Sequence, residues 1–507
     1  MVGHPFPPLH FLRFLGVLAV ISCAPCAIYA AGDLISELQR QNFTVLVPSS
    51  SGYLNASTAF NLRFTFKPAA ITFPKTSEDV STVLKLSTAH NFRAVARSGG
   101  HSYVANGLGG KNGVVVVDMS NFNTVAVDTS TNVATIGTGN RLGDVALALN
   151  ENGRALPHGT CPYVGIGGHS GHGGYGFTSR KWGLTLDTIT SLEVVLANGT
   201  IVTASGSSHA DLFWALRGSS SSFGVVTSIH ATTFAVPASA SVFEYIWDLS
   251  ASNASSSFAA FQSFVLSPNF PQEFGANLIL RTGSSKGQVS FRLLGGWYAP
   301  ADQFNATIAP FLAKLPAPAS TRLTVGTYIE SIQSLGGLGR LNTVGIPDSH
   351  DTFYAKSLMT PAASPMSTTS VNAFMTYLAN QGFEANTTWF VDVELYGGTN
   401  SAINNVPLDA TAFAHRSTMF TFQFYTSALG GMPPFPSQGF TLLDGMVDSI
   451  VDNNPTGWDY GAYTNYIDDR LVNWQNLYYG LHYSRLKSLK DRYDPKDTFK
   501  FPLSIEE

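Results

Sequence analysis

The sequence predicts an α+β protein with more than one domain, and three observations support this prediction. Its 507 residues are roughly three times the length of a typical single domain. Helix-like and strand-like segments are mixed along the chain. The composition combines 44% apolar residues and 47 glycines with only 12% charged residues. This composition is typical of a densely packed, loop-rich globule, and it excludes disorder as the main state.

The first half of the chain contains clear local signals. Thr76, followed three residues later by Asp79, is typical of a helix N-terminus, and the apolar spacing after it predicts an amphipathic helix that ends near Asn91. Asn198-Gly199 predicts the turn of a hairpin over residues 192–204. Further strands are predicted over residues 92–96, 113–119, 132–137 and 223–229, and further helices over residues 142–149 and 210–217.

A boundary is predicted at Val236-Pro237, where a Ser/Ala-rich stretch follows. From there to about Tyr466 the pattern is again α+β. Residues 471–492 then become rich in tyrosine and basic side chains. In the middle part, strands are predicted over residues 289–294 and 389–395, and a helix over residues 371–379.

Charge and hydropathy exclude two classes of partner. The 29 Lys and Arg residues against 33 Asp and Glu residues give a net charge of −4, without a basic block. Nucleic-acid binding requires a positive footprint, so we expect no nucleic-acid partner. Beyond residue 30, no apolar stretch approaches the roughly 18 uninterrupted residues of a membrane helix. We therefore expect no membrane anchor.

The first 30 residues resemble a secretory signal peptide. A weakly basic start over residues 4–13 is followed by an apolar run over residues 14–21, which is too short to span a bilayer, and then by small residues. We therefore expect residues 1–30 to be removed and the protein to be extracellular. Asn-x-Ser/Thr sequons, which offer sites for N-glycans, agree with export and lie at Asn42, Asn55, Asn198, Asn253, Asn305 and Asn386.

Cysteine usage is informative because Cys23 and Cys26 lie inside the predicted signal peptide. Only Cys161 remains in the mature chain, so no intrachain disulfide can form. A single thiol in an oxidising compartment is expected to be buried, to pair with another chain, or to be consumed by a covalent bond to another group.

Two glycine-rich segments are candidates for ligand binding. Residues 159–176 contain eight glycines in eighteen residues, and successive free N–H groups in such a run can bind anionic oxygens such as a pyrophosphate. A merely flexible loop is the alternative. His169 and His172 could suggest a metal, but no third ligand is nearby and we expect none. Ser98-Gly99-Gly100-His101-Ser102 follows a predicted strand, but it is not a Rossmann or Walker motif.

Six motifs occur in one order along the chain, and together they resemble the berberine-bridge-enzyme-like branch of the vanillyl-alcohol-oxidase flavoproteins. Within this branch the chain is most similar to the secreted fungal oligosaccharide oxidases, the glucooligosaccharide oxidases among them. The resemblance covers nearly the whole mature chain. The motifs lie at residues 97–103, 159–176, 211–218, 223–227 and 463–466 and at Tyr493-Asp494-Pro495.

The resemblance implies a PCMH-type FAD-binding domain that is discontinuous, over residues 31–236 and 467–507. An α+β substrate domain over residues 237–466 would cover the flavin. It also implies a bicovalent FAD, attached to His101 through its 8α-methyl group and to Cys161 through C6, which would explain the lone cysteine. The other cofactor contacts implied are made by the backbone, at Ser98, Gly99, Gly100, Ser102, Gly165, Gly167, Gly168, Val225 and Val226.

Oxidation of an alcohol by hydride transfer needs a base that removes the hydroxyl proton. The resemblance implies that Tyr466 is this base and that Glu394 is its acidic partner. Strand alternation places Asp392 on the same face as Glu394. Asp392, Tyr103 and Gln423 match substrate-side positions. Alternatively, Tyr466 is a packing tyrosine, and Asp392 and Glu394 are solvated strand residues.

The function implied is a secreted, FAD-dependent oxidase that converts the reducing-end C1 hydroxyl of an oligosaccharide to the lactone and reduces O2 to H2O2. We expect a monomer. One alternative is a dehydrogenase of the same fold that uses a quinone or another acceptor. Another is a secondary-metabolite oxidase acting on an aromatic or alkaloid substrate. A non-catalytic secreted glycoprotein is a third.

Overall fold

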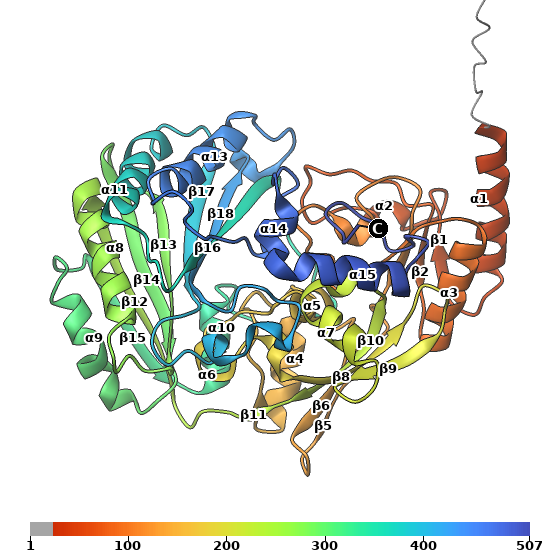
Figure 1. Cartoon of the computed structure of the whole chain (residues 1–507), viewed down its shortest axis with the longest axis horizontal. Helices are drawn as coiled ribbons and strands as arrows, with labels where there is room; N and C mark the ends of the chain where they lie inside the picture. Colours follow the sequence, from red (N-terminus) through yellow and green to blue (C-terminus); the bar gives the residue numbers. More distant parts are fainter. Residues whose placement is uncertain (1–23, 507) are drawn as a thin grey trace, which may run out of the picture.

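The computed structural model describes residues 24–506 and confirms the α+β class. The predicted signal peptide lies mostly outside the described residues; its last part begins helix α1 (Ala24–Gln39). In Figure 1, a large sheet with helices on one face forms the left half, two smaller sheets form the right half, and the C-terminal helices lie over the right half. None of the helices within the described range is long and apolar enough to cross a membrane.

The first small sheet has the order β1-β2-β4-β3, and its central strand β4 runs parallel to both neighbours. The predicted capping box at Thr76 and Asp79 is present and starts the helix that connects β2 to β3. The strand β3 ends at Arg97, directly before the glycine-containing segment 98–102. Its elements are β1 (Thr44–Leu46), α2 (Tyr53–Ala56), β2 (Ala70–Phe73), α3 (Ser77–Ala89), β3 (Ala94–Arg97) and β4 (Val115–Asp118).

The second small sheet is antiparallel, in the order β5-β6-β10-β8-β9. The predicted hairpin turn is confirmed, because Asn198-Gly199 joins β8 to β9 and Gly199 has a φ of +80°. Its elements, with the helices between them, are β5 (Val125–Asp128), β6 (Val133–Gly137), α4 (Leu142–Glu151), α5 (Ile166–Gly171), α6 (Ser179–Trp182), β8 (Ile189–Val195), β9 (Ile201–Ser205), α7 (Ala210–Ser219) and β10 (Val225–Thr232). Strands β7 (Arg154–Ala155) and β11 (Phe234–Ala235) form a separate pair.

The large sheet has seven antiparallel strands in the order β15-β12-β14-β13-β17-β18-β16. Its strands are β12 (Ala240–Ser250), β13 (Phe274–Thr282), β14 (Gln288–Trp297), β15 (Ser320–Gly326), β16 (Phe353–Pro361), β17 (Thr388–Leu395) and β18 (Thr418–Ser427). The helices of this half are α8 (Ala251–Val265), α9 (Phe304–Leu312), α10 (Tyr328–Leu335), α11 (Thr368–Tyr377), α12 (Ala402–Asn405) and α13 (Gln438–Val451).

Alternation along β17 separates a packing face from a polar face. Val391 and Val393 are fully buried in the core that α8, α11 and α13 form against the sheet. Asp392 and Glu394 therefore point away from these helices, toward the first half of the chain. The apolar face holds the sheet in place, and the polar face is free to form a site.

The C-terminal segment returns to the first half through α14 (Trp474–Tyr479) and α15 (Tyr483–Tyr493). The Lys490 ammonium is fully buried and donates to the Asp494 carboxylate at 2.7 Å and to the carbonyl of Ser222 at 3.1 Å. The Ile505 amide donates to the Ser222 hydroxyl at 3.1 Å. This docking agrees with a discontinuous first domain, whose boundaries stay a prediction.

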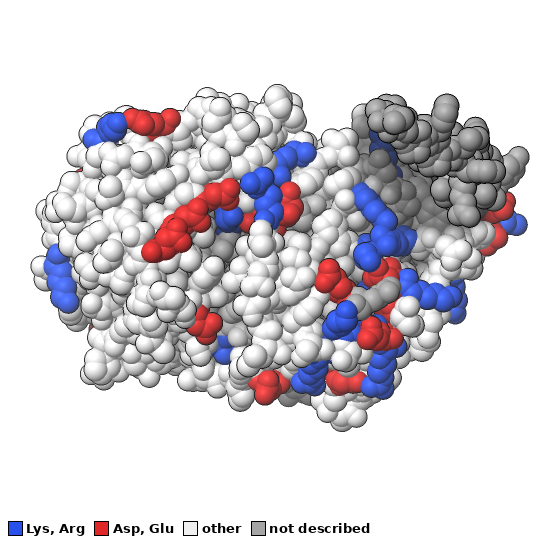
Figure 2. All heavy atoms as spheres, turned by 45° about the horizontal axis from the view of Figure 1, so that its top comes forward, with Lys and Arg blue, Asp and Glu red and all other residues white. Residues whose placement is uncertain are grey.

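Charged side chains are sparse on the surface. On the face shown in Figure 2, basic and acidic residues are interspersed and separated by wide uncharged areas. This distribution follows from the low charge content of the sequence.

Candidate active site

A cavity of about 450 Å³ lies where the two small sheets, the large sheet and the 463–467 segment meet. The glycine-rich segments 98–102 and 159–168 form one side, here called the loop wall, and β17 and β18 form the opposite side, here called the strand wall. The structure brings nearly all predicted site residues to this cavity: Ser98, Gly99, Gly100, His101, Ser102, Tyr103, Cys161, Gly165, Gly167, Gly168, Val226, Asp392, Glu394, Gln423 and Tyr466. Val225 does not line the cavity, because its side chain is buried in the core of the first sheet; its predicted backbone contact with the cofactor stays a prediction.

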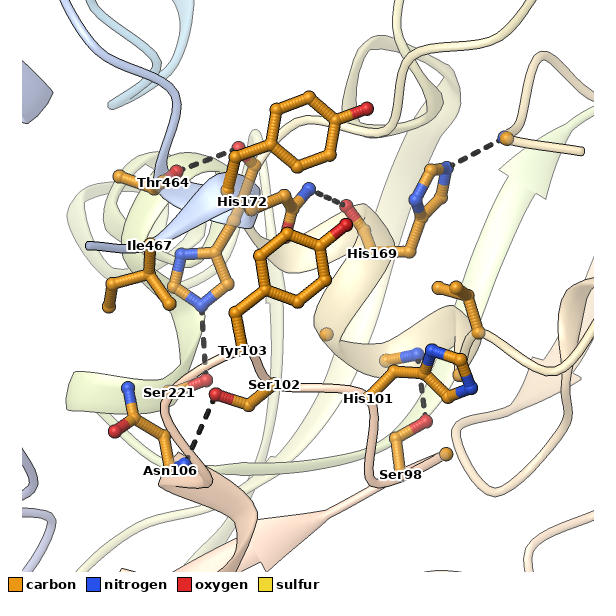
Figure 3. Close-up of a pocket in the computed structure, with 18 of the residues that line it drawn as sticks. Ser98, His101, Ser102, Tyr103, Asn106, His169, His172, Ser221, Thr464 and Ile467 are labelled. Atoms are coloured by element: carbon orange, nitrogen blue, oxygen red, sulfur yellow. Dashed lines mark hydrogen bonds between the residues drawn. The ribbon is translucent and has the colours of Figure 1, made fainter. Parts of the chain in front are cut away.

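The loop wall is formed by two backbones in direct contact. A Cβ atom added at Gly99 would collide with the backbone of Gly165, and one added at Gly165 would collide with the backbone of Gly99. The Ser98 hydroxyl donates to the carbonyl of Thr138 and accepts from the Gly167 amide at 3.2 Å (Figure 3). Ser98 therefore shapes the wall. A Cβ at Gly168 would meet no atom within 4 Å, so glycine there leaves room in the cavity.

His101 and Cys161 both line the cavity from the loop wall. The His101 ring stacks on Phe60 at 4.0 Å between centroids, and its Nε2 lies 2.6 Å from Oδ2 of Asp348. Cys161 is an exposed free thiol. Although the residue is accessible from the cavity, the surrounding protein partly desolvates the thiol and so raises its pKa, whereas backbone hydrogen bonds from Tyr163 and Val164 lower the pKa. A nitrogen nucleophile and a thiol are therefore available to the same ligand.

The Tyr-x-Asn-Tyr motif docks on the glycine-rich run and places Tyr466 in the cavity. The Tyr463 hydroxyl accepts from the Gly174 amide at 2.9 Å. The Asn465 amide donates to the carbonyl of His169 at 3.1 Å and to the Tyr463 hydroxyl at 2.9 Å. Asn465 was not predicted as a site residue, although its place in the Tyr-x-Asn-Tyr motif was a signal.

Tyr466 and Glu394 form a hydrogen-bonded pair. The Tyr466 hydroxyl donates to Oε1 of Glu394 at 2.6 Å. Glu394 is only 5% exposed, and burial raises its pKa well above the ordinary value. Burial also raises the pKa of Asp392 to about 6, against Arg281 and Arg292, which lower it. The pair can therefore hold or move a proton within the cavity.

Tyr103 connects the two walls. The Gln423 amide on β18 donates to the Tyr103 hydroxyl at 2.6 Å. The Tyr103 ring lies parallel to the Tyr466 ring, with an interplanar angle of 8° and 5.9 Å between centroids. Gln423 lies opposite Asp392 in the ladder between β17 and β18. The substrate-side residues predicted from sequence therefore surround Tyr466.

Several buried polar atoms that line the cavity have no hydrogen-bond partner. They are Oδ1 of Asn106, Nδ1 of His172, Oδ1 of Asp392 and Oε2 of Glu394. Figure 3 shows His172, Ser221, Ser102 and Asn106 gathered in one part of the cavity. Buried polar atoms are nearly always satisfied in proteins, so these atoms indicate a polar ligand. Sequence reasoning missed Asn106 and considered His172 only as a metal ligand.

A nucleotide cofactor with many acceptors and donors fits this cavity, given the room at Gly168, the unpartnered atoms and the two nucleophiles. Within the described residues, no group of three or more His, Cys, Asp or Glu side chains is arranged to hold a metal ion.

Two family models match parts of the chain. One, described as an FAD binding domain, matches residues 68–205, and the other, described as berberine and berberine like, matches residues 462–506. Curated relatives align with nearly the whole chain. A xylooligosaccharide oxidase from Thermothelomyces thermophilus is 35% identical and a chitooligosaccharide oxidase from Gibberella zeae 34% identical, each over 98% of this chain and 99% of the relative.

Solved structures of related oxidases superpose closely on this chain. Glucooligosaccharide oxidase from Acremonium strictum, described with a 6-S-cysteinyl, 8α-N1-histidyl FAD, has a TM-score of 0.86 at 32% identity, over 93% of this chain and 99% of that chain. Xylooligosaccharide oxidase from Myceliophthora thermophila in complex with xylobiose has a TM-score of 0.85 at 34% identity, over the same shares. These matches confirm the predicted PCMH-type FAD-binding fold and the oxidoreductase class. The chain belongs to the berberine-bridge-enzyme-like family of FAD-linked oxidoreductases.

Proposed function

We propose that this chain oxidises the reducing-end C1 hydroxyl of an oligosaccharide to the lactone and passes the two electrons through FAD to O2, which becomes H2O2. The observation that carries the proposal is the 2.6 Å hydrogen bond from Tyr466 to Glu394 in the cavity that His101 and Cys161 also line. The names of the relatives, oxidases of xylo- and chitooligosaccharides, support the substrate class.

His101 and Cys161 would hold the cofactor at its 8α-methyl group and at C6. When bound, FAD supplies the acceptor for the hydride, which carries the two electrons of the oxidation. The backbones of the loop wall and of Val226 would bind the rest of the cofactor. Two tethers would keep it attached in an enzyme that works outside the cell.

Tyr466 would receive the proton of the substrate hydroxyl. Burial and the nearby Glu394 raise the pKa of Tyr466 well above its ordinary value, so a phenolate is strongly disfavoured. Burial also raises the pKa of Glu394, which makes this carboxylate a better proton acceptor. We propose that Tyr466 gives its own proton to Oε1 of Glu394 as it takes the proton of the substrate. This relay moves one proton without leaving a buried phenolate.

The strand wall would orient the sugar. Gln423 and Tyr103 offer donors and acceptors, and the unpartnered oxygen of Asp392 offers an acceptor for a sugar hydroxyl. Sugars carry many hydroxyl groups, so a wall with several polar side chains suits them.

Replacing Tyr466 with Phe tests the proposal. Because the general base would be missing, we expect flavin reduction by oligosaccharide to slow by about 100- to 10,000-fold. The flavin should stay bound. Tyr460→Phe, which alters a tyrosine packed on Trp458 away from the cavity, is the matched control. Normal reduction in Tyr466→Phe, measured by stopped-flow absorbance, would contradict the proposed role.

A substrate and acceptor screen separates the alternatives. Oligosaccharides, phenols and alkaloids should be compared with O2 and with a dye acceptor. We expect turnover of oligosaccharides with O2 and stoichiometric H2O2. Turnover with dye alone would indicate a dehydrogenase, and turnover of aromatic compounds alone would indicate a secondary-metabolite oxidase.

We also propose that the protein is secreted and N-glycosylated. All six sequon asparagines predicted from the sequence are exposed, which supports this proposal. Enzymatic deglycosylation of the protein from culture medium should lower its mass. Retention of the protein inside the cells would contradict secretion.

A further inference from the structure

His101 is held by two residues that sequence reasoning did not connect with it. Phe60 stacks on the face of the imidazole, and the Asp348 carboxylate lies 2.6 Å from Nε2. Asp348 belongs to the connection between α10 and β16, which lies 247 residues away in the sequence. Asp348 is not among the residues that line the cavity, and its direct contact with the lining is the one to His101.

The contact fixes which imidazole nitrogen carries the proton. Burial raises the pKa of Asp348, but the hydrogen bond from His101, the Ser349 amide and the charge of Arg141 favour the ionised form, and the pKa lies below its ordinary value. An ionised carboxylate only accepts hydrogen bonds, so Nε2 of His101 must donate. In the neutral imidazole, Nδ1 then carries the free lone pair.

We propose that Asp348 is a positioning residue that makes Nδ1 of His101 the nucleophile in covalent attachment of FAD. The inference rests on the proposed function, which requires this attachment. One C–H bond of the 8α-methyl group breaks, and one bond from that carbon to Nδ1 forms. The two electrons released reduce dioxygen, which leaves as H2O2 with the methyl proton and one proton from solvent. Nε2 keeps its proton, so the alkylated ring is a cation.

Asp348 would assist this step in two ways. Its hydrogen bond holds the ring so that Nδ1 is the nitrogen left for the cofactor. Its charge, 2.6 Å from Nε2, stabilises the positive charge that the ring acquires. The carboxylate has the opposite effect on Cys161, because the negative charge of Asp348 raises the pKa of the thiol. Asp348 therefore favours attachment at His101 and not at Cys161.

The experiment uses Cys161→Ser as background, so that any covalent flavin reports on His101 alone. In this background, Asp348→Asn and Asp348→Glu are compared. Asp144→Asn is the matched control, because Asp144 accepts from the amide and hydroxyl of Thr343 in the same connection without contacting His101. Flavin that stays with acid-precipitated protein is measured at purification and during incubation with FAD in air. Peptide mass mapping then locates the adduct.

We expect Asp348→Asn to slow attachment by roughly 10- to 100-fold, the range found when a carboxylate that orients a metal-binding histidine is removed. Asp348→Glu should restore much of the rate, since it keeps the charge, and Asp144→Asn should leave it unchanged. A packing role predicts the reverse order, in which Asn is tolerated and Glu is not.

If flavin attaches at the same rate in Asp348→Asn as in the parent Cys161→Ser variant, the inference is wrong. It is also wrong if the His101 peptide of that parent carries no flavin. Oligosaccharide oxidation is assayed separately on the chain with Cys161 intact. If Asp348→Asn oxidises oligosaccharides and attaches flavin at the normal rate, only the role of Asp348 is refuted. If the wild-type chain does not oxidise oligosaccharides, the proposed function is refuted.

Discussion

The two walls of the cavity are constructed in different ways. In the loop wall, Gly99 and Gly165 lack side chains because two backbones touch there, and the open space at Gly168 leaves room for a ligand. In the strand wall, Asp392, Glu394 and Gln423 project side chains whose properties depend on burial and on hydrogen-bond partners. Substitutions in the loop wall should therefore affect cofactor binding, whereas those in the strand wall should affect turnover and substrate binding.

Among substitutions in the two walls, the largest effect is expected in the strand wall, at Glu394. Glu394→Gln keeps an oxygen that accepts the Tyr466 hydrogen bond but cannot take a proton. We expect the rate of flavin reduction to fall by about 100-fold or more while the flavin stays attached. Glu384→Gln, which removes an exposed carboxylate paired with Lys286, is the control. An unchanged reduction rate would remove Glu394 from the proton relay.

The next effect is in the loop wall, at Gly165. Its φ of −76° is open to any residue, so Gly165→Ala tests the collision of a Cβ with the Gly99 backbone and the Ser98 hydroxyl rather than backbone strain. Overpacking of this kind costs about 1–3 kcal/mol. We expect lower FAD content and a lower melting temperature, with near-normal turnover per bound flavin. Gly206→Ala is the control, because a Cβ there meets no atom. A loss of turnover at full FAD content would break the distinction between the walls.

Much of the architecture could be predicted from the sequence because its signals are local. The capping box at Thr76, the hairpin turn at Asn198-Gly199 and the shared face of Asp392 and Glu394 each depend on residues only a few positions apart. The glycine spacing of the loop wall is also local. These features therefore needed no knowledge of tertiary contacts.

The remaining features depend on contacts between distant segments. Asp348 reaches His101 across 247 residues, and Gln423 reaches Tyr103 across 320 residues. No local pattern marks either pair. Strand alternation turns the side chain of Val225 into the core while Val226 lines the cavity, so the backbone contact predicted for Val225 stays a prediction. The unpartnered oxygen of Asn106 is likewise visible only once its neighbours are placed.

A smaller effect should appear in the pH dependence of the strand wall. The negative charge of Asp392 raises the pKa of Glu394, after the larger effect of burial. The proton relay needs ionised Glu394, so kcat should fall as the pH drops through the pKa of this group. Asp392→Asn removes the neighbouring charge, lowers the pKa of Glu394 and should move the acidic limb of the kcat profile to lower pH, on the order of one unit. If the acidic limb of the kcat profile does not shift in Asp392→Asn, the two carboxylates do not interact.

The smallest expected effect concerns Gln423, which touches Tyr103 and not the proposed proton relay. Gln423→Leu removes a neutral hydrogen bond worth about 1 kcal/mol, so KM for the oligosaccharide should rise by roughly fivefold with kcat little changed. Tyr103→Phe removes the same hydrogen bond from the other side, and the double variant should lose little more than either single one. Because the Tyr103 ring lies parallel to that of Tyr466, a large fall in kcat in Gln423→Leu would mean that the hydrogen bond also orients the base. Substrate orientation by Gln423 and Tyr103 and proton transfer by Tyr466 would then depend on each other.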